Sequence, residues 1–392
     1  MGSEKTNKPK RRFKGFNDAW EQRKLGDIAI YRRGSFPQPY GKSEWYDGED
    51  AKPFVQVADV TDAMNLVDDT KQKISKLAQP MSVFAEKGSV LVTLQGSIGR
   101  VAITQYGAFV DRTVLIFEKY KTEIDNLFWA YVIKQKFIEE ARKAPGGTIK
   151  TITKEALSDF DLLLPNYNEQ CAIGLYFKNL DHLITLHQRK LDKLKNMKKS
   201  YLSEMFPQEG EIKPKRRFAG FTDAWEQRKL GEVITVGNGM DYKELGEGDI
   251  PVYGTGGYML SVDKALSYEK DAVGIGRKGT IDKPYILKAP FWTVDTLFYC
   301  IPKENYSLDF VFGLFQNINW KQKDESTGVP SLSKVNINST DVKCPSLSEQ
   351  QKIGTYFRNL DHLITLHQRK LEKLKNMKKA NSDYLRCCYR LA

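Results

Sequence analysis

A stretch of 21 residues occurs twice in this chain, at an offset of 180 positions. Asn179–Lys199 reads NLDHLITLHQRKLDKLKNMKK, and Asn359–Lys379 differs from it only by Glu372 in place of Asp192. A repeat at a fixed long offset indicates two copies of one structural unit. The chain must therefore fold into something that uses the same helical element twice.

Apolar residues recur through both copies at alternating spacings of four and three, which is the heptad pattern of a coiled coil. A polar lysine, Lys198 or Lys378, interrupts each stripe near its end. Two such helices in one chain most simply bury their stripes against each other. The predicted interface consists of Ile173, Phe177, Leu180, Ile184, His187, Leu191 and Leu194 in the first copy and of Ile353, Phe357, Leu360, Ile364, His367, Leu371 and Leu374 in the second.

A second repeat precedes each helix. Lys8–Asp27 returns as Lys213–Glu232 with 17 of 20 positions identical, at an offset of 205, so the first half is 25 residues longer between its repeats. The organisation is thus shared ends around two different middles, 28–164 and 233–344. Within the second repeat, the run that starts at Asn17 or Thr222 predicts a capped helical turn, followed by a glycine turn and a strand.

Short β-like runs and one helical segment are expected in each middle. The predicted strands are 54–60, 89–94, 100–104 and 113–117 in the first middle and 251–253, 272–275 and 296–300 in the second. The predicted helices are 125–142 and 308–317. Pro165 and Pro345 mark the starts of the long helices, with Asn168 or Ser348 as the expected N-cap.

The length and the net charge indicate a basic protein with several domains. A chain of 392 residues is too long for a single ordinary hydrophobic core, and the formal net charge is +12. Such an excess suits a polyanion, most commonly nucleic acid. Five cysteines without framework spacing indicate reduced thiols. No apolar run is long enough to span a bilayer and no secretory signal is present, so we expect a cytoplasmic location and no membrane partner.

A search for catalytic or metal-binding motifs finds none that holds. All four histidines lie on the repeated helices, five apart within each copy, which is not the spacing of an i,i+4 metal pair. Gly274–Gly279 matches G-x-G-x-x-G, but Thr-Ile-Asp-Lys-Pro follows it instead of the helix that a dinucleotide fold needs. This segment is better interpreted as a hairpin tip that carries two cations.

Loops that combine small polar groups with cations are the candidate DNA contacts, because such groups reach phosphates and base edges. An ordinary solvated loop is the competing interpretation. The first-half candidates are Arg32, Arg33, Ser97, Arg100, Lys150, Thr151 and Lys154, and those of the second half are Tyr253, Thr255, Arg277, Lys278, Ser331 and Lys334. If Arg277 touches a base, its replacement by alanine weakens binding by about 1–3 kcal/mol.

Two similar scaffolds that carry different middles describe a device with internal pseudo-two-fold symmetry and two specificities. If the helices pack antiparallel, the two middles face one ligand together from opposite ends of a rod. On DNA, half-sites one helical turn apart are separated by about 34–36 Å, and helices of this length span that distance. The pattern therefore predicts a split, asymmetric recognition sequence with an unread spacer.

The layout resembles the specificity subunit of type I restriction–modification systems. The resemblance rests on the duplicated architecture, on Leu-Leu-Pro-x-x-Asn-Glu-Gln at 163–170 and Cys-Pro-x-x-Ser-Glu-Gln at 344–350 leading into the Asp-His-Leu-Ile helices, and on the Trp-Glu-Gln-Arg-Lys-Leu-Gly starts at 20–26 and 225–231. It covers essentially the whole chain. After Lys379 the second helix departs from the first copy, which affects the expected packing of its last turns.

The resemblance implies an α+β fold in which a long antiparallel two-helix coiled coil separates two mixed α/β target-recognition domains. The implied division is a basic tail at 1–10, recognition domains at 11–164 and 211–345, a central helix with connector at 165–210 and a C-terminal helix at 346–392. The implied partners are double-stranded DNA, two methyltransferase subunits and, through them, restriction–translocase subunits. Catalysis, with AdoMet, ATP and Mg²⁺, would belong to those partners and no cofactor to this chain.

Two other classes of protein remain open at this point. One is a solitary DNA-modifying or DNA-cleaving enzyme with its own active site, which metal-dependent cleavage by the purified chain would reveal. The other is an assembly scaffold with an incidental basic surface. Sequence-independent binding that is lost at moderate salt would favour the scaffold, because phosphate contacts alone are strongly salt-dependent.

Overall fold

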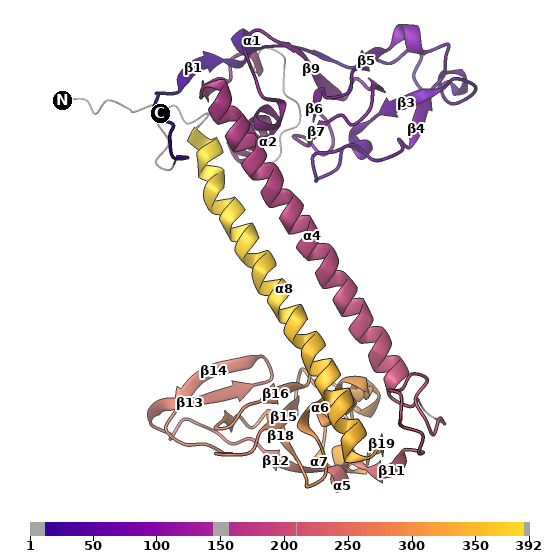
Figure 1. Ribbon diagram of the computed structural model, residues 1–392, viewed down its shortest axis with the longest axis vertical. Coiled ribbons are helices and arrows are strands. Elements are labelled where there is room, and N and C mark those ends of the chain that lie inside the picture. The colour runs from indigo at the N-terminus through magenta and orange to yellow at the C-terminus, as the bar shows by residue number, and fades with distance from the viewer. Residues whose placement is uncertain (1–11, 144–156, 209, 388–392) are drawn as a thin grey trace, which may run out of the picture. The chain divides into compact units, whose positions relative to one another are not determined.

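A computed structural model describes residues 12–143, 157–208 and 210–387. The chain divides into two compact units. Unit 1 comprises Met1–His187 and Lys370–Ala392, and unit 2 comprises Gln188–Arg369. The two long helices, α4 (Tyr167–Met205) and α8 (Leu347–Cys387), each contribute one part to either unit (Figure 1).

Two four-stranded sheets and a helix form the first middle. One sheet is antiparallel and has the order β2-β9-β6-β7. Its strands are Ala29–Arg33, Val114–Tyr120, Val90–Thr93 and Val101–Ile103. The second sheet has the order β4-β3-β8-β5, in which β3 and β8 are parallel. Its strands are Gln72–Ile74, Lys52–Val55, Ala108–Val110 and Val83–Ala85.

Helix α2 (Asn126–Lys143) contacts β6 and β7, and the 3₁₀ turns are Ser43–Trp45, Val57–Asp59 and Gln79–Met81.

The second middle repeats this arrangement. An antiparallel sheet has the order β12-β18-β15-β16, with strands Ile234–Asn238, Leu297–Pro302, Ala272–Gly276 and Tyr285–Leu287. A three-stranded sheet has the order β14-β13-β17, with strands Gly257–Val262, Glu247–Gly254 and Trp292–Thr293, and β13 and β17 are parallel. Helix α6 (Leu308–Asn317) contacts β15 and β18, and the 3₁₀ helix Trp320–Lys323 and helix α7 (Lys334–Ser339) follow.

The two middles share one fold although their residues hardly align. Corresponding backbone bonds show the equivalence: Leu94 N–H donates to Thr113 in unit 1, and Arg277 N–H donates to Thr296 in unit 2, both at 2.8 Å. Most expected elements lie where periodicity placed them, and helix 308–317 matches to the residue. The strand expected at 54–60 is shorter, because the chain turns into a 3₁₀ helix at Val57.

The helical turn expected in the second repeat is misplaced. Glu21–Lys24 and Glu226–Lys229 are strands β1 and β11, and the helical turns α1 (Leu25–Ile28) and α5 (Leu230–Val233) come after them. Each strand pairs with the segment just before a long helix, β10 (Asp161–Leu164) or β19 (Asp341–Cys344). This long-range pairing overrides the local helical preference.

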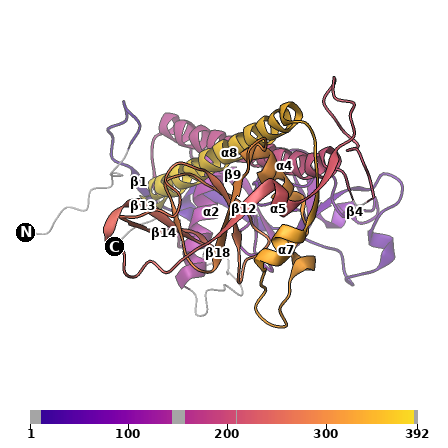
Figure 2. The same cartoon turned by 90° about the horizontal axis from the view of Figure 1, so that it is seen from below.

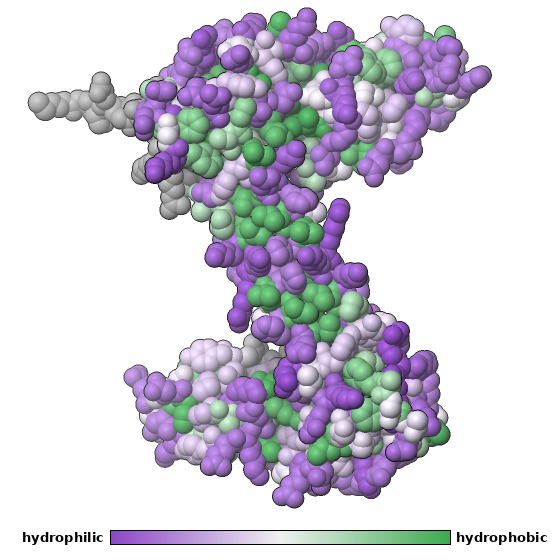
Figure 3. All heavy atoms as spheres, viewed as in Figure 1, coloured by the Kyte–Doolittle hydropathy of each residue, from purple (hydrophilic) through white to green (hydrophobic). Residues whose placement is uncertain are grey.

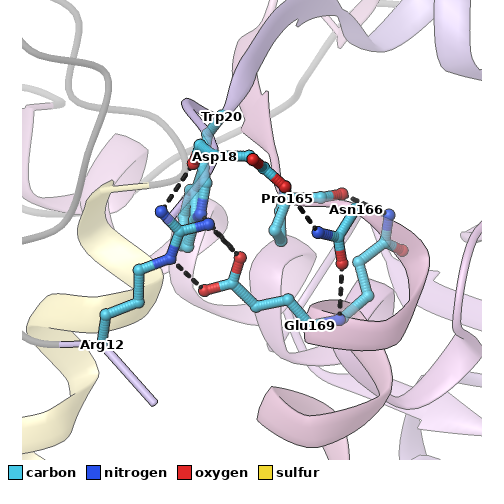
Figure 4. Close-up of polar contacts among 7 residues, drawn as sticks. Arg12, Asp18, Trp20, Pro165, Asn166 and Glu169 are labelled. Carbon is cyan, nitrogen blue, oxygen red and sulfur yellow. Dashed lines mark hydrogen bonds and ion pairs between the residues drawn. The ribbon is translucent and has the colours of Figure 1, made fainter. Parts of the chain in front are cut away.

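The expected N-caps are also wrong. Helix α4 begins two residues earlier than expected, and the side chain of Asn166, not Asn168, accepts the backbone N–H of Glu169 at 3.0 Å (Figure 4). Ser348 lies inside α8, which begins at Leu347. Proline therefore marks the starts of both helices, and in α4 the residue directly after it supplies the side-chain cap.

The long helices lie side by side and antiparallel (Figures 1 and 2). In unit 2, Lys198 of α4 bonds Asp361 of α8 at 2.5 Å, and the rings of Tyr201 and Tyr356 lie 5.5 Å apart. In unit 1, Lys378 pairs with Asp181, and Asn381 donates to the Tyr176 hydroxyl at 2.6 Å. In both units, contacts further along α4 involve residues that come earlier in α8, so the two helices run antiparallel.

The core of each unit includes the first turns of one long helix. Ile173 and Phe177 of α4 join the buried cluster of unit 1 around Trp20 and Trp129, and Ile353 and Phe357 of α8 join that of unit 2. Along the helices, apolar side chains alternate with polar ones on the visible face (Figure 3). The fold is thus α+β with an internal repeat. No helix within the described ranges is long and apolar enough to cross a membrane.

Candidate nucleic-acid interface

The glycine-rich tip of unit 2 follows strand β15. A Cβ on Gly276 would lie 2.1 Å from the carbonyl oxygen of Thr280, so only glycine fits there. Gly279 adopts a φ of +85°. The tip leads into β16, which pairs antiparallel with β15, and this confirms the hairpin interpretation over a dinucleotide site. Arg277 and Lys278 project from this tip as exposed side chains.

A second loop is fastened to this tip. Lys278 and Ser331 form an isolated β-bridge, Gly279 N–H donates to the Pro330 carbonyl at 2.8 Å, and Leu332 N–H donates to that of Arg277 at 2.9 Å. The predicted contacts Arg277, Lys278 and Ser331, of which the last is more than 50 positions from the other two in the sequence, therefore lie together. We call this surface, Gly276–Gly279 with Asp324–Leu332, the tip–loop pair.

Asp324 holds that loop in shape. One oxygen of its carboxylate accepts the backbone N–H groups of Ser326 and Ser331, each at 2.9 Å, and the Ser326 hydroxyl at 2.8 Å. These hydrogen bonds, the one from Ser331 first, lower the pKa of the carboxyl group. The loop is thus preorganised by a charge-assisted cap and not by burial.

The three other predicted residues of unit 2 lie outside the tip–loop pair. Lys334 is the first residue of α7, directly after the loop. Thr255 lies in the turn between β13 and β14, and Tyr253 accepts the Val294 N–H at 3.0 Å through its backbone carbonyl. The Arg277 guanidinium donates to the Asp295 carbonyl at 3.4 Å and lies 5.9 Å from the Phe298 ring centroid. Segment 294–296 thus connects the two groups of candidates.

In the corresponding tip of unit 1, the cation Arg100 is less exposed than Arg277 and Lys278 of unit 2. Ser97 lies in the turn after β6, and its carbonyl accepts the Thr93 hydroxyl at 2.5 Å. Arg100 is half-buried and lies 3.3 Å from the Asp62 carboxylate, with a 3.4 Å bond to the Val60 carbonyl. Its guanidinium is therefore already engaged within the unit.

The remaining predicted residues of unit 1 lie on strand β2 or outside the described residues. Arg32 and Arg33 end strand β2, an edge strand, and Arg32 lies 3.6 Å from Glu118 of the neighbouring strand. Lys150, Thr151 and Lys154 lie outside the described residues. Among the described candidates, Arg277, Lys278 and Ser331 of unit 2 are those that the contacts between the tip and its loop bring together.

Structural equivalence reveals candidates that the sequence did not. The backbone bonds of the two middles place Leu94 where Arg277 stands, and Arg112 where Asp295 stands. Arg112 is exposed, and its guanidinium lies 5.8 Å from the ring centroid of Tyr40, which is itself 55% exposed. An exposed aromatic ring beside an arginine is a suitable platform for nucleic acid. Arg112 lies in the short turn between β8 and β9, where nothing in the sequence indicates that it meets Tyr40.

One ion pair recurs in both units, between the start of the second repeat and the start of a long helix. In unit 1, the Arg12 guanidinium makes two bonds of 2.7 and 2.6 Å to the buried carboxylate of Glu169, which also accepts the Trp20 indole at 3.1 Å (Figure 4). In unit 2, Arg217 makes the same two bonds to buried Glu349 at 2.6 and 2.7 Å. These bidentate pairs tie the start of each repeat to the start of a long helix.

Within the described ranges, no group of three or more His, Cys, Asp or Glu side chains could hold a metal ion. Among the predicted interface residues, ten are buried in their units. The other four, which are Ile184, Leu194, His367 and Leu374, are half-buried. Direct contact between these predicted interface residues and the facing helix stays a prediction.

Comparison with known proteins agrees with this arrangement. A family model described as the type I restriction modification DNA specificity domain matches residues 17–196 and 222–376. The type I restriction enzyme MjaVIII specificity subunit of Methanocaldococcus jannaschii is 20% identical over 92% of this chain and 90% of that protein. The S subunit of the type I restriction–modification system of M. genitalium has a TM-score of 0.67 at 17% identity, over 98% of this chain and all of that one. A structure that describes complex assembly and conformational transition of the type I system has a TM-score of 0.50 at 14% identity, over 94% and 98%.

The duplicated fold and the family match together define the class of protein as a DNA specificity protein. The chain belongs to the family of type I restriction–modification DNA specificity subunits. Catalysis in such a system is the task of the partner subunits.

Proposed function

We propose that unit 1 and unit 2 each read one half of a bipartite, asymmetric DNA site, with α4 and α8 setting the unread spacer. The observation that carries this proposal is the equivalence of the two middles. They share strand order and backbone bonding, yet Arg277 and Lys278 in one correspond to Leu94 and Gln95 in the other. One scaffold with two different tips is what two different half-sites require.

The proposed contacts of unit 2 are Tyr253, Thr255, Arg277, Lys278, Ser331 and Lys334. In unit 1 we retain Arg32, Arg33, Ser97, Arg100, Lys150, Thr151 and Lys154, and we add Tyr40 and Arg112 because their side chains lie together at the surface. Arginine and lysine would reach phosphates or guanine edges, and the hydroxyl groups would reach base edges. We keep the division into recognition domains at 11–164 and 211–345 as part of the same proposal.

The proposed partners follow from the repeat. Two copies of one helix surface suit two copies of one methyltransferase subunit, through which restriction–translocase subunits would join. AdoMet, ATP and Mg²⁺ would be bound by those subunits, in the cytoplasm. The likeness to a solved structure that concerns complex assembly of the type I system supports partners of this kind in general terms.

Adenine-methylation mapping tests the proposal. Plasmid DNA from cells that co-express this chain with a matching methyltransferase subunit should show one split motif with a fixed spacer. A continuous motif, or methylation that is independent of sequence despite a soluble complex, would contradict it. The matched control is the methyltransferase subunit expressed alone, which should leave the motif unmodified.

A further inference from the structure

Three elements of unit 1 meet at one polar cluster. The ammonium group of Lys378, on α8, pairs with one carboxylate oxygen of Asp181, on α4. The other oxygen of Asp181 accepts the hydroxyl of Tyr131, on α2, at 2.7 Å. The same lysine nitrogen lies 5.9 Å from the Tyr131 ring centroid. The cluster therefore joins both long helices to the helix of the first middle.

Unit 2 contains the corresponding cluster with the helices exchanged. Lys198 of α4 bonds Asp361 of α8 at 2.5 Å, and its nitrogen lies 5.7 Å from the ring centroid of Phe312, on α6. The pairs are partly buried, with 15% and 35% of the Lys198 and Asp361 side chains exposed, and 33% and 30% of those of Lys378 and Asp181. Both lysines are the residues that interrupt the apolar stripes.

A charged residue on an apolar helix seam generally lowers stability but specifies one register. The apolar stripes by themselves tolerate a slip of seven residues, because the pattern repeats every heptad. Such a slip would put Leu371 opposite Asp181, and Leu191 opposite Asp361, in place of the two lysines. Each carboxylate would then face leucine in place of its lysine, at the cost of a partly buried ion pair.

We propose that Lys198 and Lys378, with Asp361 and Asp181, are positioning residues that lock the register of the two helices against the middles and thereby fix the spacer length that the protein accepts. The inference rests on the proposed function, in which the helices set the spacer. A slip of one heptad moves a helix by about 10 Å. That displacement corresponds to roughly three base pairs of DNA.

The test uses the complex with its methyltransferase subunit and DNA sites whose spacer is native or changed by one to three base pairs. A variant with all four residues changed to leucine (D181L, D361L, K198L and K378L) removes both locks. We expect its melting temperature to change little, because leucine suits the seam whereas the buried Tyr131 hydroxyl loses its acceptor. We expect its preference for the native spacer, measured as a ratio of methylation rates, to fall at least tenfold.

Charge reversal gives an independent test that does not require the leucine variant to fold. D181K alone and D361K alone should lose spacer preference, and D181K/K378D and D361K/K198D should regain it. The matched control is K195L/K375L, at exposed equivalent positions of the same helices, which should change nothing. Unchanged spacer preference in a folded leucine variant, or reversal pairs that do not recover, would overturn the proposal. Failure of the proposed function is distinct, since the unaltered protein would then show no split motif.

Discussion

Glu169 and Glu349 are buried carboxylates whose charge is balanced by one arginine each. The Glu349 side chain is 1% exposed and that of Arg217 is 13% exposed. Both members of each pair stand in the repeats, but nothing in the sequence indicates that they meet, because Arg217 and Glu349 are 132 positions apart. The sequence shows which charged residues are present, whereas only the fold shows which of them pair.

Glu349→Ala should therefore destabilise unit 2 by about 3–5 kcal/mol, because it leaves a largely buried guanidinium without its counterion. Urea unfolding followed by circular dichroism measures this loss. Glu372→Ala, on the exposed face of the same helix, serves as the control and should change stability by less than about 0.5 kcal/mol. Equal stability of the two variants would show that the pair contributes little.

Asp324 offers a second prediction at this scale. Asp324→Ala should release the loop of the tip–loop pair and weaken DNA binding several-fold without lowering the melting temperature, because the lost bonds lie at the surface. Fluorescence anisotropy with a cognate duplex measures the affinity. Glu269→Ala, an exposed carboxylate elsewhere in unit 2, controls for the change in charge. An affinity change equal in the two variants would assign the effect to charge alone.

At the scale of elements, the existence of the long helices could be predicted, because heptad spacing sustained from 173 to 194 has few alternatives. The Glu-Gln-Arg-Lys strands were not, since their partners lie more than 110 positions away. The sequence predicted similar elements in the two middles but not their common strand order. Their strands are paired mostly by backbone bonds, which impose little on residue identity.

Gly354 gives a prediction for the element α8. Alanine normally stabilises a helix interior by up to about 1 kcal/mol relative to glycine. A Cβ here would lie 2.8 Å from the Asp309 Cβ and 2.9 Å from the Phe310 nitrogen, so it would push α6 away from α8. We expect Gly354→Ala to destabilise unit 2 by about 1–3 kcal/mol, as overpacking does. Asn376→Ala on the exposed face of α8 should be neutral or slightly stabilising in the same urea titration.

The duplicated design yields a prediction for the whole molecule. If each unit reads its own half-site, R277A/K278A should relax only one half of the methylated motif and leave the other half and the spacer intact. Arg112→Ala should relax the opposite half. Methylation mapping reads both outcomes in one experiment. Loss of sequence preference in both halves from either variant would contradict independent reading.

The division of the chain into units has a consequence for its synthesis. Unit 2 is one continuous segment, but unit 1 includes the first residues described and is completed only by the segment from Lys370 onward. At ribosomal rates of about 5–20 residues per second, roughly 10–40 s separate the two parts of unit 1. During that interval Asp181 and Tyr176 of α4 lack the partners Lys378 and Asn381 that α8 supplies. The half that is translated first is thus the half that finishes folding last, and it depends on the nascent chain reaching the end of α8.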